Sequence, residues 1–190
     1  MMNNIPSDNS SKQMRESKVS IGLCNPKSPE NVGSVMRAAG NYRVDSVFYT
    51  GRRYPRAVEL NPDIPRMSRS VSQDIPLSGV NCLLDEAADD MQIVCVEFAM
   101  NATPLPEYQH PENAFYIFGP EDGTLSQEVI DSADAVVYVP TEGCMNLSAT
   151  VNVLLYDRMI KSYQGVEGNA VIRKSRDRNN NVKVRAVRKG

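Results

Sequence analysis

Polar residues gather in three stretches of this 190-residue chain, at positions 25–37, 118–123 and 139–149. Each stretch follows an apolar run of the kind that forms a buried strand, and each leads into a helical pattern. Ligands of open α/β sheets bind beyond the carboxyl ends of the strands. Gly119, Pro120, Glu121 and the loop 140–146 would share one such rim. We therefore predict the functional site there, with Gly119 allowing a ligand to approach the backbone closely.

This sequence lacks the residue patterns that several kinds of site require. The single histidine, His110, lies in a proline-flanked loop, and the four cysteines have no metal-ligand spacing. We predict reduced, mostly buried thiols and no metal site. No GxGxxG follows the first apolar run and no GxxxxGK[ST] is present, so dinucleotide-binding and P-loop nucleotidase functions lack their fingerprints.

Alternating elements must position the three stretches. Strands are predicted at 19–23, 46–50, 92–98, 114–118 and 135–139, with a shorter one within 75–80, and helices at 28–40, 80–90, 126–132 and 147–163. Loops are predicted at 51–75 and 102–113. This alternation predicts an α/β fold with a mostly parallel sheet flanked by helices.

The length and composition predict one domain with two tails. The expected boundaries are a disordered tail at 1–17, a domain at 18–165 and a basic tail at 166–190. No apolar run approaches the roughly 20 residues that span a bilayer. The polar N-terminal stretch has no apolar signal region, which predicts a cytoplasmic protein.

Charge is distributed unevenly along the chain. Residues 171–190 hold eight Lys/Arg and one Asp, a net +7, whereas the other residues hold 13 basic and 22 acidic groups, a net −9. A basic tail on an acidic body indicates contact with a polyanion. A solvated, solubilising tail is the alternative.

The three stretches also resemble the three motifs of the SPOUT RNA methyltransferases, in the SpoU/TrmH branch of ribose 2′-O-methyltransferases that includes small TrmL-like members. The first motif has the form N-x-G-x-x-x-R between Asn31 and Arg37. One motif alone is weakly specific, but three in order over residues 19–161 are strongly specific. The resemblance implies a deep trefoil α/β knot near the C-terminus, S-adenosyl-L-methionine as methyl donor, and a homodimer whose subunits complete each other's sites.

Four residues match the catalytic positions of that branch. Arg37 would activate the ribose hydroxyl, and because a guanidinium keeps its proton, electrostatic stabilisation suits it better than proton abstraction. Asn31 would position Arg37 or the RNA, and Asn146 would lie next to the donor. The Glu121 carboxylate would orient Arg37 or Asn31 by a charge-assisted hydrogen bond. Without the resemblance, Arg37 reads as a solvated helix residue and the other three as helix-terminal residues.

The resemblance also places the donor among Phe98, Gly119, Val139, Cys144 and Leu147. Apolar side chains there would sandwich the adenine, although core packing would explain Phe98, Val139 and Leu147 equally well. Cys144 departs from the serine common at this position, which removes a hydroxyl donor. No histidine lies near Cys144 in sequence, so we do not assign it as a nucleophile.

Two groups of basic residues are candidates for binding RNA, with transfer RNA favoured over ribosomal RNA. They are Arg52, Arg53, Arg56, Arg66 and Arg69 in the first group, and Arg173, Lys174, Arg176 and Arg178 in the second. A solvated surface is the alternative for the first group. The rival functions are an RNA-binding or assembly protein that keeps the fold without catalysis, and a SPOUT enzyme that methylates a base.

Overall fold

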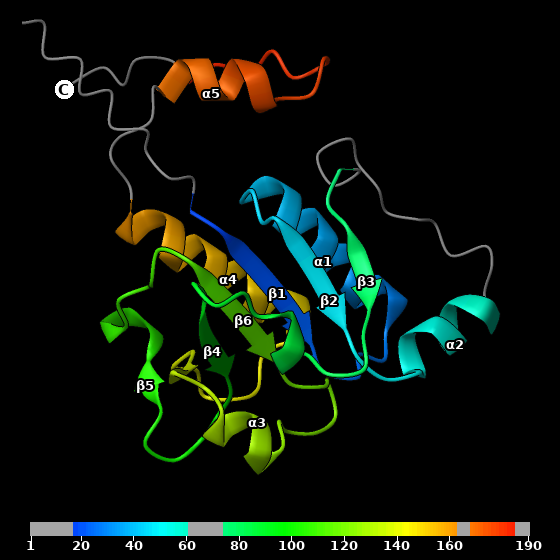
Figure 1. Ribbon diagram of the computed structural model, residues 1–190. Coiled ribbons are helices and arrows are strands. Elements are labelled where there is room, and N and C mark those ends of the chain that lie inside the picture. The colour runs from blue at the N-terminus through cyan, green and yellow to red at the C-terminus, as the bar shows by residue number, and fades with distance from the viewer. Residues whose placement is uncertain (1–16, 61–73, 163–167, 185–190) are drawn as a thin grey trace, which may run out of the picture.

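The computed structural model describes residues 17–60, 74–162 and 168–184, and within them it shows a parallel sheet with helices on both faces (Figure 1). The strands are β1 Val19–Leu23, β2 Ser46–Tyr49, β3 Leu77–Gly79, β4 Gln92–Val96, β5 Thr103–Pro104, β6 Ala114–Phe118 and β7 Ala135–Tyr138. The helices are α1 Pro29–Asn41, α2 Arg53–Leu60, α3 Gln127–Asp131, α4 Leu147–Lys161 and α5 Gly168–Ser175, with 3-10 turns at Leu84–Glu86 and Leu105–Glu107. The predicted α/β class is confirmed.

The seven described strands are ordered β3-β2-β1-β6-β4-β7-β5, and all their pairings are parallel. Every residue of β1 and β6 is buried, as expected for strands covered on both faces. The carboxyl ends of β6, β4 and β7 are neighbours in this order. The stretches that follow these three strands therefore emerge side by side at one edge of the sheet.

Alternate side chains of each strand serve two separate cores. Ile21, Tyr116 and Val94 face the helices α1 and α4, which pack against each other on one side of the sheet. Phe115 and Ile117 face the opposite side, where α3 covers them. Figure 1 shows α1 and α4 on the same face of the sheet.

Two predictions about secondary structure are wrong. Residues 53–60 form helix α2 instead of part of a loop. Pro55 misled the prediction, because proline is tolerated in a first helical turn, and the Tyr54 ring packs 5.0 Å from that of Tyr49. Conversely, 80–90 contains only a 3-10 turn at Leu84–Glu86. Acidic side chains near the end of 80–90 would interact unfavourably with the dipole of a helix. Leu83 is buried in the core that α3 covers.

The loop prediction for 102–113 also needs amendment, because it contains the two-residue strand β5 at the sheet edge. Edge strands tolerate proline, which explains Pro104 in this position. The predicted N-terminal tail falls outside the described residues except for Ser17. Within the described ranges, no helix combines the length and apolarity needed to cross a bilayer.

The cysteines only partly match their prediction. All four are free, but only Cys95 is buried, whereas Cys24 and Cys82 are partly exposed and Cys144 is exposed. Burial raises the pKa of the Cys95 thiol to about 12, and the negative charge of Glu97 adds to the effect. Cys95 therefore stays protonated and unreactive.

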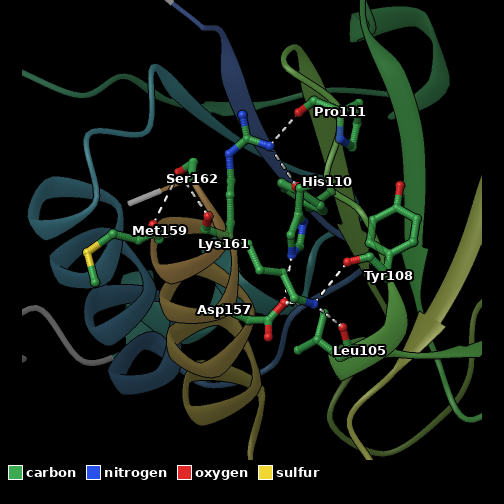
Figure 2. Close-up of polar contacts among 10 residues, drawn as sticks. Leu105, Tyr108, His110, Pro111, Asp157, Met159, Lys161 and Ser162 are labelled. Atoms are coloured by element: carbon green, nitrogen blue, oxygen red, sulfur yellow. Dashed lines mark hydrogen bonds and ion pairs between the residues drawn. The ribbon is translucent and has the colours of Figure 1, made fainter. Parts of the chain in front are cut away.

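The end of α4 is fixed to the chain around β5 and β6 by a polar cluster, which we call the His110 cluster (Figure 2). The cluster consists of His110, Tyr116, Asp157, Arg158 and Lys161. His110 Nε2 lies 2.9 Å from Asp157 Oδ2, and Nδ1 lies 2.7 Å from the Tyr116 hydroxyl. Lys161 also contacts Asp157, at 2.7 Å. Because a carboxylate only accepts hydrogen bonds, Nε2 carries the imidazole proton and Nδ1 accepts from Tyr116.

Backbone carbonyls complete the His110 cluster. Arg158 donates to the carbonyls of Pro111 and Glu112, each at 2.6 Å. Lys161 donates to the carbonyls of Leu105 at 2.6 Å and Tyr108 at 2.9 Å. Figure 2 shows the α4 side chains reaching across to this segment. The histidine that the sequence left without a role therefore anchors the far end of the helix that begins at the predicted site.

Acidification should weaken the His110 cluster before it affects the carboxylates. The side chain is only 4% exposed, and burial lowers the pKa of His110, although Asp157 opposes the shift. A base with a depressed folded pKa binds its proton more tightly when unfolded. The free energy of unfolding should therefore fall as the pH drops below about 6.5, by at most about 1.4 kcal/mol per pH unit.

Urea unfolding between pH 7.5 and 5 measures this effect. The variant His110→Gln should show a flatter pH profile in the same window, because it has no imidazole to protonate. Glu121 and Asp122 do not titrate in this window, because their pKa values are lowered from their ordinary values. Identical slopes for the two proteins would contradict the prediction.

Candidate active site

A pocket lies at the carboxyl ends of β4, β6 and β7, where the sequence predicted the site. The pocket opens to solvent, and its empty volume, which includes the open mouth, is about 680 Å³. The lining residues come from the ends of these strands and from the start of α4. All five residues that the resemblance placed around the donor line it: Phe98, Gly119, Val139, Cys144 and Leu147.

The pocket combines apolar walls with a close approach to the backbone. Phe98 and Tyr138 both line it, with ring centroids 5.7 Å apart. A Cβ at Gly119 would lie 3.0 Å from Glu97 Oε2 and 3.4 Å from the Leu125 amide nitrogen. A side chain here would therefore crowd the Glu97 carboxylate and the Leu125 amide, in addition to any ligand that approaches.

Three predicted residues from separate loops are joined by hydrogen bonds, and we call them the amide relay. Asn31 Nδ2 donates to Glu121 Oε1 at 3.1 Å, and Asn146 Nδ2 donates to Asn31 Oδ1 at 2.9 Å. Asn146 Oδ1 in turn accepts from the backbone nitrogen of Ser148 at 2.9 Å, which caps α4. The three stretches of the sequence therefore converge, and Asn146 both caps a helix and joins the relay.

Glu121 fixes the start of α1. Its Oε1 also accepts from the Ser28 backbone nitrogen at 3.0 Å, and its Oε2 accepts from that of Lys27 at 2.9 Å. Burial raises the pKa of this carboxyl, but the hydrogen bonds from Ser28, Asn31 and Lys27 outweigh it and lower the pKa overall. Glu121 is therefore a carboxylate at neutral pH and orients Asn31, which is one of its two predicted partners.

Arg37, the other predicted partner, does not join this group. It is exposed on α1 and does not line the pocket of its own chain. Within the described residues it has no hydrogen-bond or ion-pair partner. Asn31 and Arg37 also point in different directions, because six residues along a helix correspond to a rotation of about 240°.

The first group of predicted RNA-binding arginines is divided by the structure. The two terminal nitrogens of Arg53 donate to the two carboxylate oxygens of Asp122, at 2.8 and 2.7 Å. The Arg53 guanidinium is therefore already engaged by Asp122. Arg52 and Arg56 are exposed beside it. Arg66 and Arg69 lie outside the described residues.

The turn between β2 and α2 depends on a glycine. Gly51 has φ of +79°, and a Cβ there would lie 2.2 Å from Asn25 Oδ1. The loops after β1 and β2 therefore nest together next to Glu121 and Asp122. In the second group, Arg173, Lys174, Arg176 and Arg178 are all exposed on and after α5.

Sequence reasoning missed several pocket residues, of which Glu97 is the most informative. It follows β4 and lines the pocket, and its Oε2 accepts from the Leu125 backbone nitrogen at 2.9 Å. The available signal was an acid near the end of an otherwise apolar run. Met145, Thr150 and Tyr138 gave no such signal, because residues of these types occur throughout cores and helices.

Known proteins share the sequence pattern of this chain. Residues 18–156 match the SpoU rRNA Methylase family. A Staphylococcus epidermidis protein whose name places it among the TrmH family tRNA/rRNA methyltransferases is 28% identical over 159 residues, covering 80% of this chain and 62% of that protein. A Staphylococcus aureus protein of the same name is 27% identical over 135 residues, covering 68% and 53%. The chain therefore spans about 62% or less of the length of these relatives.

Solved structures share the fold. The SpoU methyltransferase AviRb from Streptomyces viridochromogenes, in complex with AdoMet, has a TM-score of 0.64 and 19% identity, covering 85% of this chain and 67% of that chain. A TrmH/SpoU tRNA modifying enzyme from A. aeolicus has a TM-score of 0.60 and 14% identity, covering 84% and 88%. The fold, the pocket and the match over residues 18–156 lead to one conclusion: the chain belongs to the SpoU rRNA Methylase family.

Proposed function

We propose that this protein transfers a methyl group from S-adenosyl-L-methionine to a ribose 2′-hydroxyl of RNA. The observation that carries the proposal is the amide relay, which joins three motif stretches at the rim of one pocket. The expected substrate is transfer RNA, with ribosomal RNA second. Relatives named for both substrates support these two classes of RNA. The order is supported by a solved structure from work on 2-OH methylation of C/U34 on tRNA (TM-score 0.62, 20% identity).

The pocket suits the donor chemically. Phe98, Val139 and Leu147 provide apolar surface for an adenine, and Gly119 provides close backbone approach. Cys144 is exposed at the pocket and would contribute a backbone group. When bound, the donor supplies an electrophilic methyl group on a positively charged sulfur.

The chain's own residues then position the RNA and stabilise charge. Glu121, which lines the pocket, holds Asn31, and Asn31 accepts from Asn146, which lies between the lining residues Met145 and Leu147 in sequence. Arg37 would hold a phosphate and stabilise the oxygen that develops negative charge during transfer. Because Arg37 lies outside its own chain's pocket, we place it at the pocket of a second subunit in a homodimer.

A stripe of exposed apolar side chains on α4 supports the homodimer. Val153, Tyr156 and Ile160 are 36%, 52% and 45% exposed, and their spacing places them on one helix face. Met159 adds to this face at 39%. Since α4 packs beside α1, an interface on the stripe would bring Arg37 close to a partner.

The proposal also includes a trefoil knot in the fold. It further includes action in the cytoplasm, where the RNA would be found. The knot rests on the match to the family. A crystal structure, with the backbone path tested for threading, would check it. An unthreaded path would remove the knot without affecting the pocket.

Labelled methyl transfer to total RNA tests the function and separates it from its rivals. We expect label in RNA and, after nuclease digestion, a resistant dinucleotide, because a methylated 2′-oxygen cannot attack the neighbouring phosphate. Label in ordinary mononucleotides would indicate base methylation. RNA binding without transfer would indicate a binding or assembly protein.

The basic tail should contribute salt-dependent affinity for RNA. Replacing Arg173, Lys174, Arg176 and Arg178 by glutamine removes four exposed charges. The slope of log affinity against log salt should then decrease in magnitude by about three, because fewer counterions are released. Binding of labelled transfer RNA at several salt concentrations measures the slope. An unchanged slope would mean that the tail does not contact the RNA.

A further inference from the structure

The part of the pocket that one chain provides carries charge of only one sign. Among the described residues that line it, the charged side chains are Glu97 and Glu121, and no lysine, arginine or histidine is present. Glu121 is committed to the amide relay and to the start of α1 through three accepted hydrogen bonds. Glu97 is therefore the lining carboxylate that does not belong to the amide relay.

The Glu97 carboxylate is held against the backbone of Gly119 at the pocket. Its Oε1 accepts from the Phe98 backbone nitrogen at 3.0 Å, and its Oε2 accepts from that of Leu125 at 2.9 Å. Oε2 also lies 3.0 Å from the position of a Cβ on Gly119. The carboxylate thus crosses from the end of β4 to the loop after β6.

Glu97 also retains part of its hydrogen-bonding capacity. Each oxygen accepts one hydrogen bond, although a carboxylate oxygen can accept two. Within the described ranges Glu97 has no ion-pair partner. An uncompensated carboxylate at an apolar pocket favours a cationic ligand over a neutral one of the same shape.

We propose that Glu97 makes the pocket select the cationic methyl donor over its demethylated product. The inference rests on the proposed function and adds a specificity-determining residue to it. S-adenosylmethionine carries a sulfonium, whereas S-adenosylhomocysteine has an uncharged thioether and is otherwise the same molecule. Loss of the methyl group therefore removes the attraction to Glu97, which weakens binding of the product and speeds its release.

Calorimetric binding to the full chain and to Glu97→Gln tests the proposal. The substitution keeps the side chain's shape and removes its charge. We expect affinity for S-adenosylmethionine to fall about tenfold and affinity for S-adenosylhomocysteine to change by less than about twofold. Sinefungin, in which a protonated amine replaces the sulfonium, should follow the donor. Glu128→Gln removes an exposed carboxylate on α3 and should leave all three affinities unchanged.

The outcomes distinguish the inference from the proposed function. If the unmodified protein binds neither donor nor product, the proposed function fails and the inference fails with it. If the unmodified protein binds both, and Glu97→Gln weakens both equally, Glu97 only holds the loop through Leu125 and the inference alone fails. Unchanged affinity for S-adenosylmethionine in Glu97→Gln would also overturn the inference.

Discussion

Replacing Arg37 by alanine should reduce methyl transfer by about 100- to 1,000-fold, the range seen when one donor to a developing oxyanion is removed. Affinity for S-adenosylmethionine should stay within about twofold, because the proposed role of Arg37 is to contact the RNA phosphate and the reacting oxygen and not the donor. Single-turnover transfer and calorimetry measure the two quantities. Arg37→Lys keeps the charge but loses the planar fork, so it should recover only part of the activity.

A surface substitution on the same helix provides the control for Arg37. Asn41 is the exposed last residue of α1, and Asn41→Ala should leave transfer unchanged. Full activity in Arg37→Ala would remove Arg37 from the mechanism.

Mixing two inactive variants tests whether subunits share sites. In a mixed dimer of Arg37→Ala with Glu121→Gln, one site combines the intact pocket of one chain with the intact arginine of the other. With random pairing, half of the dimers are mixed and each has one working site, so activity should recover to about a quarter of the original. No recovery in mixtures shown by light scattering to be dimeric would place Arg37 and the pocket in the same chain.

Glu121→Gln should have the second largest effect, a loss of transfer of about 100-fold. Its two oxygens accept from Lys27, Ser28 and Asn31. A glutamine presents one oxygen and one amide, so at least one of these donors would face another donor. Asn31, and through it Asn146, would lose its fixed orientation at the pocket rim.

Glu121→Ala extends the test to stability. It leaves three donors without their acceptor, and because the site is only partly buried we expect a loss of about 1–2 kcal/mol in the free energy of unfolding. Urea unfolding measures the loss, and Glu128→Gln on α3 serves as the exposed carboxylate control. If Glu121→Gln transferred methyl groups at the original rate, the amide relay would have no part in positioning.

Local patterns predicted the secondary structure well where one physical signal dominated. The apolar runs of β1 and β6 are buried on both faces, so their composition alone indicated central strands. Ser28 and the proline after it marked the start of α1, and the structure shows Ser28 capping that helix. The signals failed at 53–60 and 80–90, where packing of Tyr54 and Leu83 outweighed local propensity.

The sequence by itself determined the fold class, the family and the set of stretches that meet at one sheet edge, because these depend on short-range periodicity and motif order. Only the tertiary structure decided which side chains touch. Glu121 holds Asn31 and not Arg37, Arg53 is occupied by Asp122, and His110 anchors the end of α4. Glu121 and Asn31 lie 90 positions apart in the sequence. No local pattern encodes the direction in which such distant side chains point.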